Sequence, residues 1–108
     1  MNGDLEKYIV DADSTIEDAW TKIESNRHRS VIVVKGNKIV GTLSDGDLRK
    51  AMLSKRLLST PVRDIMNINF VSVKEDERDR AEEILKSHDI FLIPIVDEDL
   101  NLRDIIIK

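Results

Sequence analysis

The chain has 108 residues, enough for one compact domain, and contains 41% hydrophobic, 35% charged and 4% aromatic residues, which is typical of a soluble globular protein with an aliphatic core. It has no cysteine, which excludes disulfides, thiolate metal ligands and cysteine nucleophiles, and its net charge of −4 argues against nucleic acid as the main partner. No basic-then-apolar leader and no apolar run of membrane-spanning length occurs, so the sequence predicts a cytoplasmic protein without a membrane partner.

The first helix is predicted by apolar residues that recur at helical spacing. Positions i, i+3, i+4 and i+7 of one stretch are apolar and define one face of a helix. They are Ile16, Ala19, Trp20 and Ile23. Ser14 and Glu17 fit a capping box, in which a Ser oxygen and a Glu carboxylate each accept a backbone N–H. We therefore expect Ser14 to be the cap of this helix.

A hairpin and a second helix follow. The β-branched run SVIVV at 30–34 is typical of a strand that is buried on both faces. KGNK at 35–38 supplies a turn that leads into the strand IVGTLS at 39–44. The segment GTLSDGDLRKAML at 41–53 then continues from this strand into a helix. Its residues expected to be buried are Leu48, Ala51 and Met52.

The second half of the chain carries signals for the same kinds of element. Thr60 and Pro61 fit the N-cap and the first position of a short helix. FVSVK at 70–74 alternates like a strand, and the charged stretch 75–88 has apolar residues on one side of a helix. FLIPIV at 91–96 is predicted to be another buried strand.

The sequence aligns with itself when it is shifted by 62 residues. Residues paired by this shift include Ala19 with Ala81, Val31 with Ile93, Val33 with Ile95 and Val34 with Val96. Such self-similarity indicates a repeated structural unit. The chain is therefore predicted to contain two copies of a strand, helix, hairpin and helix unit, over residues 1–57 and 58–108.

The second copy is predicted to be shorter than the first. Under the same shift Ile106 falls opposite Ser44, and the sequence reaches Lys108 before any counterpart of Asp47. We therefore expect the second unit to lack its last helix. We also expect the apolar RDIIIK terminus at 103–108 to be uncovered, because neighbouring side chains of a strand face opposite sides.

In order and spacing, these segments resemble a tandem of cystathionine-β-synthase (CBS) domains, the paired regulatory module called a Bateman module. The resemblance is carried by the Thr15-Ile16-x-x-Ala19 helix start, the hairpin SVIVV…KIVGTLS, GTLSDGDLRKAML, TPVRDIMN and FLIPIVDED. It implies an α/β (α+β) fold of two units related by a pseudo-two-fold axis, with a regulatory role and no catalysis of its own. It also implies a homodimer, because CBS modules commonly pair through their helices into a disc.

A narrower resemblance concerns the enzymes that carry such modules. GTLSDGDLRKAML, the opening LEKYIVDADSTIEDA and the PVRDIM segment are similar to the N-terminal CBS pair of some bacterial sugar-phosphate nucleotidyltransferases. This implies a nucleotidyltransferase catalytic domain as the regulated partner.

The turn Asp45-Gly46-Asp47 admits several interpretations from its residues alone. Carboxylates in the first turn of a helix act as caps and favour the helix dipole. A calcium loop needs further oxygen ligands at positions where Leu48 and Ala51 stand, and a general acid–base pair needs a reaction partner that the sequence does not offer. We therefore expect no metal and no catalytic residue, and either a cap alone or a cap that also holds a ligand.

The CBS resemblance favours the interpretation in which this turn also holds a ligand. In CBS modules the pattern Ser/Thr-x-x-Asp, matched by Ser44 and Asp47 with Asp45 between them, holds an adenosyl nucleotide such as AMP, ADP or ATP. The base usually lies between the first strand and the entry to the middle strand, and Arg29 could reach phosphate. The corresponding residues of this chain are Ile9, Val10, Arg29, Ser30 and Val31.

Two departures from the family pattern leave a ligand-free alternative open. Ile32 stands where many nucleotide-binding units have proline, and the second unit has no Ser/Thr-x-x-Asp, so at most one site of this kind is intact. The alternative is a structural CBS module that mediates dimerisation.

Overall fold

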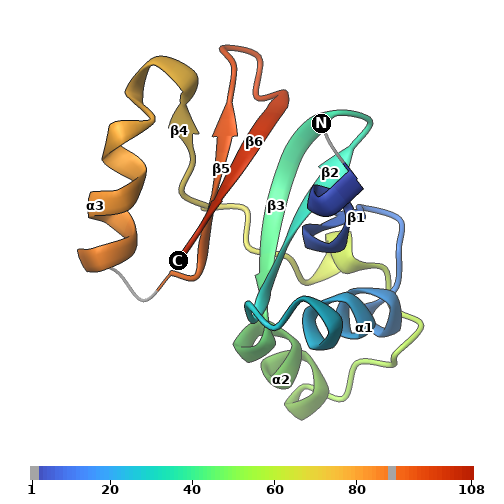
Figure 1. Cartoon of the computed structure of the whole chain (residues 1–108). Coiled ribbons are helices and arrows are strands. Elements are labelled where there is room, and N and C mark those ends of the chain that lie inside the picture. The colour runs from blue at the N-terminus through green and yellow to red at the C-terminus, as the bar shows by residue number, and fades with distance from the viewer. Residues whose placement is uncertain (1–2, 88–89) are drawn as a thin grey trace.

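The computed structural model of the chain describes residues 3–87 and 90–108, and within them the two halves repeat one architecture. Each half has a three-stranded sheet in which the first strand is parallel to the middle strand and the third is antiparallel to it (Figure 1). The strands of the first half are β1 (Ile9–Asp11), β2 (Ser30–Lys35) and β3 (Lys38–Ser44). Those of the second half are β4 (Val73–Lys74), β5 (Leu92–Val96) and β6 (Leu102–Ile107).

Helices cover the outer face of each sheet. The α-helices are α1 (Ile16–Asn26) and α2 (Asp45–Leu53) in the first half and α3 (Asp79–Ser87) in the second. Short 3-10 turns are η1 (Gly3–Tyr8), η2 (Val62–Asp64) and η3 (Glu75–Glu77). No helix follows β6 within residues 90–108, as the sequence predicted. None of the helices in the described ranges is both long enough and apolar enough to cross a membrane.

The middle strand β2 is buried on both faces, as its β-branched run predicted. Alternate residues of a strand face opposite sides, so Val31 and Val33 pack with α1 and α2. Ile32 and Val34 instead pack in a core shared with the second sheet, which contributes Leu92, Val96, Leu102 and Ile105. The core between the sheets holds the two units against one another.

The tips of the two hairpins are also joined by backbone hydrogen bonds. Ile39 N donates to Leu100 O at 3.0 Å, and Leu102 N donates to Asn37 O at 2.9 Å. These bonds fasten the units at one end of β2 and β5. The opposite ends of the two strands flank the segment that connects the units.

The cap of α1 lies one residue later than the sequence predicted. Thr15 Oγ1 accepts Asp18 N at 3.1 Å, and Asp18 Oδ2 accepts Thr15 N at 3.0 Å. Ser14 is used differently, because its N–H donates to Asp11 O and its carbonyl accepts Val62 N. Ser14 therefore belongs to a turn that binds the start of η2, and the predicted Ser14–Glu17 box is wrong.

The two elements on either side of the connecting segment, residues 65–72, are shorter than predicted. Pro61 is the N-cap, not the first residue, of the single turn η2, and β4 comprises only Val73 and Lys74 of the predicted strand 70–74. The helical turn η2 ends at Asp64 because the chain beyond it pairs with β3, where Asn67 N donates to Thr42 O at 2.9 Å. The predicted helix 75–88 is divided into η3 and α3, and its predicted last residue, His88, lies outside the described residues.

The C-terminal strand differs from the prediction in register and in burial. Leu92 pairs with Ile107, in the way that Ser30 pairs with Ser44, because the second hairpin loop is one residue longer. Ile107, not Ile106, therefore occupies the position of Ser44. Nor is the terminus uncovered: Ile105 and Ile107 pack in the core between the sheets, and Ile106 packs in the core beneath α3.

Candidate functional site

The start of α2 is closed by a reciprocal pair of hydrogen bonds. Ser44 has an extended backbone, so its side chain can reach the first turn, where Ser44 Oγ accepts Asp47 N at 3.1 Å. Asp47 Oδ2 accepts Ser44 N at 2.9 Å. The capping interpretation of this turn is therefore confirmed. Only Asp47 Oδ2 is used, and Oδ1 accepts no hydrogen bond among the residues that the structure describes.

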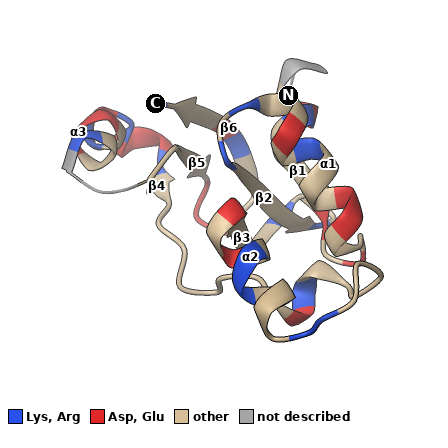
Figure 2. Ribbon diagram, turned by 90° about the horizontal axis from the view of Figure 1, so that it is seen from below, with Lys and Arg blue, Asp and Glu red and all other residues tan. Residues whose placement is uncertain are grey.

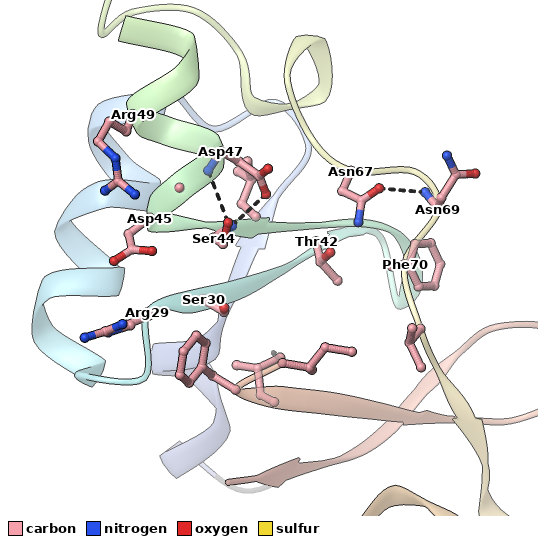
Figure 3. Close-up of a pocket in the computed structure, with 16 residues that line it drawn as sticks. Arg29, Ser30, Thr42, Ser44, Asp45, Asp47, Arg49, Asn67, Asn69 and Phe70 are labelled. Carbon is pink, nitrogen blue, oxygen red and sulfur yellow. Dashed lines mark hydrogen bonds between the residues drawn. The ribbon is translucent and has the colours of Figure 1, made fainter. Parts of the chain in front are cut away.

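This helix start opens onto a cavity of about 420 Å³ between the two units. Three parts of the chain line it: the adjacent ends of β2, β3 and α2, the connecting segment, and the residues at the entry to β5 (Figure 3). The cavity is therefore assembled by both units and by the segment that joins them.

The structure brings five of the eight predicted site residues together at this cavity and separates the other three. Those that line it are Arg29, Ser30, Ser44, Asp45 and Asp47. Ile9 and Val10 line another cavity, of about 700 Å³, together with residues of α1 and the first hairpin turn. Val31 has no exposed surface and lies in the core beneath α1 and α2. A ligand role for each of the eight residues stays a prediction.

Several lining residues were not singled out from the sequence. In the connecting segment Asn67 forms a two-way backbone bridge with Thr42, at 2.9 and 3.1 Å, and Asn67 Oδ1 accepts Asn69 N at 3.0 Å (Figure 3). Asn-x-Asn is a signal for such a side-chain turn. That this turn docks on β3 was not visible in the sequence. Phe70 and Phe91 also line the cavity.

Close packing fixes the connecting segment against β3. A Cβ built on Gly41 would lie 2.6 Å from Met66 Sδ and 3.1 Å from Asn67 O. With any larger residue the Met66 side chain would have to move aside and the Asn67 carbonyl would have to shift by a few tenths of an ångström, so glycine lets the segment lie against β3 without these shifts. Gly41 therefore helps to place Asn67 and Asn69 at the cavity.

The charged groups of the cavity are balanced in number. Arg29 and Arg49 contribute two cations, and Asp45 and Asp47 contribute two carboxylates. None of the four forms an ion pair with another described residue. Among the described residues no group of three or more His, Asp or Glu is placed to hold a metal ion. The arrangement offers donors and acceptors to a polar organic ligand that carries an anionic group.

Comparison with known proteins identifies the architecture. Residues 4–54 match the family model of the CBS domain. The chain superposes on AcuB from Vibrio cholerae with a TM-score of 0.79 and 29% sequence identity, over 93% of this chain and 76% of that one. The chain has the fold of a CBS-domain pair.

Two further structures that superpose on this chain carry bound nucleotides. A CBS domain protein from Pyrobaculum aerophilum, complexed with AMP, matches with a TM-score of 0.75 and 20% identity, over 92% of this chain and 78% of that one. CbpB from Listeria monocytogenes, in complex with c-di-AMP, matches with a TM-score of 0.76 and 21% identity, over 93% of this chain and 79% of that one. At these identities the likeness shows the fold alone.

Curated relatives are longer proteins. An uncharacterized protein from Helicobacter pylori is 32% identical over 93 residues, which are 83% of this chain and 28% of that protein. Arabinose 5-phosphate isomerase GutQ from Escherichia coli is 29% identical over 99 residues, which are 84% of this chain and 31% of that protein. The chain thus spans about three tenths of the length of these relatives, neither of which is named a nucleotidyltransferase.

Proposed function

We propose that this CBS-domain pair binds an adenine nucleotide, AMP, ADP or ATP, in the 420 Å³ cavity and thereby regulates an associated enzyme. The observation that carries the proposal is the convergence of Ser44, Asp47 and Arg29 on one cavity between the two units. The AMP and c-di-AMP complexes of proteins with the same fold support it.

The residues suit the parts of a nucleotide. The free Oδ1 of Asp47 would accept from a ribose hydroxyl, since a carboxylate is an acceptor-only group matched to a diol. Arg29 would bind the phosphate, for which a guanidinium is well shaped. The side chains of Asn67 and Asn69, which carry both donors and acceptors, would be available to the base.

Regulation would follow from the position of the cavity. A ligand that contacts both units and the connecting segment favours one arrangement of the units over another, provided that its affinity differs between the two arrangements. The resemblance in sequence suggests a sugar-phosphate nucleotidyltransferase as the regulated enzyme, and the similarity to GutQ suggests a sugar-phosphate isomerase. Both kinds of enzyme act on sugar phosphates, and we propose an enzyme of that class.

Thermal unfolding with and without ligand tests the proposal. A ligand present at about 100 times its Kd should stabilise the folded protein by about 2.7 kcal/mol. We expect this stabilisation with at least one of AMP, ADP and ATP. No change of Tm with any of them would contradict nucleotide binding and would favour the alternative, a ligand-free module that mediates dimerisation. A Tm that rises with protein concentration would indicate dimerisation, which both hypotheses expect, so the response to nucleotide is what distinguishes them.

A further inference from the structure

Arg29 is held in an unusual backbone conformation at the boundary between the units. Its φ angle is 61°, in the left-handed region that residues other than glycine seldom adopt. Its carbonyl oxygen accepts Asp45 N at 2.9 Å, and β2 begins at the next residue. The backbone of Arg29 is thus fixed by α2 on one side and by the sheet on the other. Its side chain is exposed and forms no ion pair with a described residue.

The side chain of Arg29 meets an aromatic ring of the other unit. The guanidinium carbon lies over the ring of Phe91, 5.3 Å from the ring centre. Phe91 directly precedes β5 and is half-buried. Lys108 Nζ lies 5.8 Å from the same ring centre, and Lys108 N donates to Phe91 O at 3.0 Å. One ring of the second unit therefore gathers two cations, within the range of cation–π attraction.

This contact leaves the guanidinium able to bind an anion. A guanidinium has five N–H groups, and no carboxylate of the described residues forms an ion pair with that of Arg29. A side chain that is already held by a ring loses less conformational freedom when it binds a ligand. Asp45 also lines the cavity and disfavours an anion close to it, so the anionic group is best placed on the Phe91 side of Arg29.

We propose that Phe91 is a positioning residue for the ligand site of the first unit: its ring holds the Arg29 guanidinium where it binds the phosphate of a nucleotide. The proposal rests on the nucleotide-binding function proposed above and adds to it a contribution from the second unit. Phe91 acts through Arg29, and Lys108 adds positive charge beside the same ring. The phosphate end of the ligand would then depend on the contact between the units, whereas the nucleoside end would not.

Calorimetric titration with adenosine and with AMP, at one ionic strength, distinguishes binding of the nucleoside from binding of the phosphate. Phe91→Leu removes the ring and should weaken AMP binding about two- to fivefold, the usual size of an exposed cation–π contact. Adenosine binding should not change. Phe91→Tyr keeps the ring and should restore wild-type affinity for AMP. Thermal unfolding of each variant checks its folding, and Phe91→Met replaces Phe91→Leu if the latter does not fold.

A double-mutant cycle tests whether Phe91 acts through Arg29. Arg29→Gln should weaken AMP binding, and adding Phe91→Leu to it should cause no further loss. Lys35→Gln removes the same charge at the far end of β2 and should leave AMP binding unchanged. An equal loss of adenosine and AMP affinity in Phe91→Leu, or additive losses in the double variant, would overturn the positioning role.

The outcomes also separate this inference from the proposed function. If the wild-type protein binds AMP and Phe91→Leu binds it equally well, the inference alone is wrong. If the wild-type protein binds neither adenosine nor any of AMP, ADP and ATP, the proposed function is wrong and the inference falls with it.

Discussion

At the scale of residues, the same four-residue cap begins both α1 and α2. Thr15 with Asp18 and Ser44 with Asp47 form the same two reciprocal hydrogen bonds, with lengths of 2.9 to 3.1 Å. Asp18 is exposed, whereas Asp47 is half-buried and lines the cavity between the units. The cap is therefore a structural device in both helices. Asp18 lines the cavity of about 700 Å³, whereas Asp47 shares the cavity of about 420 Å³ with Arg29, which can bind an anionic group.

This pair of caps provides a matched test of Asp47. Asp47→Ala and Asp18→Ala should each cost the fold about 1 kcal/mol, as the loss of a capping side chain usually does. Only Asp47→Ala should also weaken nucleotide binding, by about 1.5–3 kcal/mol, the scale of a hydrogen bond to a charged group. Denaturant unfolding and calorimetric titration measure the two effects. Unchanged nucleotide affinity in Asp47→Ala would show that the residue is a cap only.

At the scale of elements, the connecting segment 65–72 is placed by β3 and not by its own secondary structure. It leaves η2, bridges to Thr42 through Asn67, and then lines the cavity. The bridge depends on the close approach to Gly41, whose missing Cβ leaves room for Met66 and Asn67. The geometry of the cavity is therefore coupled to one glycine of a neighbouring strand.

Substitution of this glycine should damage both stability and binding. Gly41→Ala forces Met66 and the Asn67 backbone outward, which should cost about 1–3 kcal/mol of stability, as overpacking does. It should also weaken AMP binding, because Asn67 and Asn69 move. Gly36→Ala is the control: Gly36 has φ +65° and no atom within 4 Å of a built Cβ, so it should cost about 1–2 kcal/mol through strain alone. If Gly41→Ala binds AMP with normal affinity, nucleotide binding does not depend on the contact of Gly41 with Met66 and Asn67.

At the scale of the whole molecule, one surface combines exposed leucines with positive charge. Leu53, Leu57 and Leu58, here called the leucine surface, have exposed fractions of 80%, 70% and 45%. Residues 48–63 contain five Lys and Arg and no Asp or Glu, in a chain of net charge −4. Figure 2 shows these cations on α2 and the loop after it, and acidic residues on α3. Exposed apolar surface of this kind is typical of an interface.

We therefore predict a homodimer that buries the leucine surface. Light scattering over a range of concentrations should give twice the mass of one chain for the wild type. The double variant Leu53→Lys and Leu57→Lys should give the mass of one chain, because charges would replace the apolar contacts. Ile68→Lys is the control, since Ile68 is 68% exposed but lies outside this surface. A monomeric wild type, or equal dissociation by Ile68→Lys, would contradict this interface.

The sequence by itself determined the features that depend on neighbouring residues. The β-branched run at 30–34, the turn at 35–38 and the strand at 39–44 defined the hairpin. The helical spacing from Ile16 to Ile23 defined α1, and Ser44 and Asp47 defined the start of α2, because each of these patterns acts over a few residues. Whether Ser14 or Thr15 caps α1 was decided by tertiary contacts, since Ser14 is taken up by hydrogen bonds to Asp11 and Val62. The packing of the two sheets likewise separated Ile9 and Val10 from Asp47 and brought Phe91 to Arg29. The two units are offset by 62 residues, and contacts between them produce no pattern within a short stretch of sequence. They depend on the close packing of many side chains from both sheets.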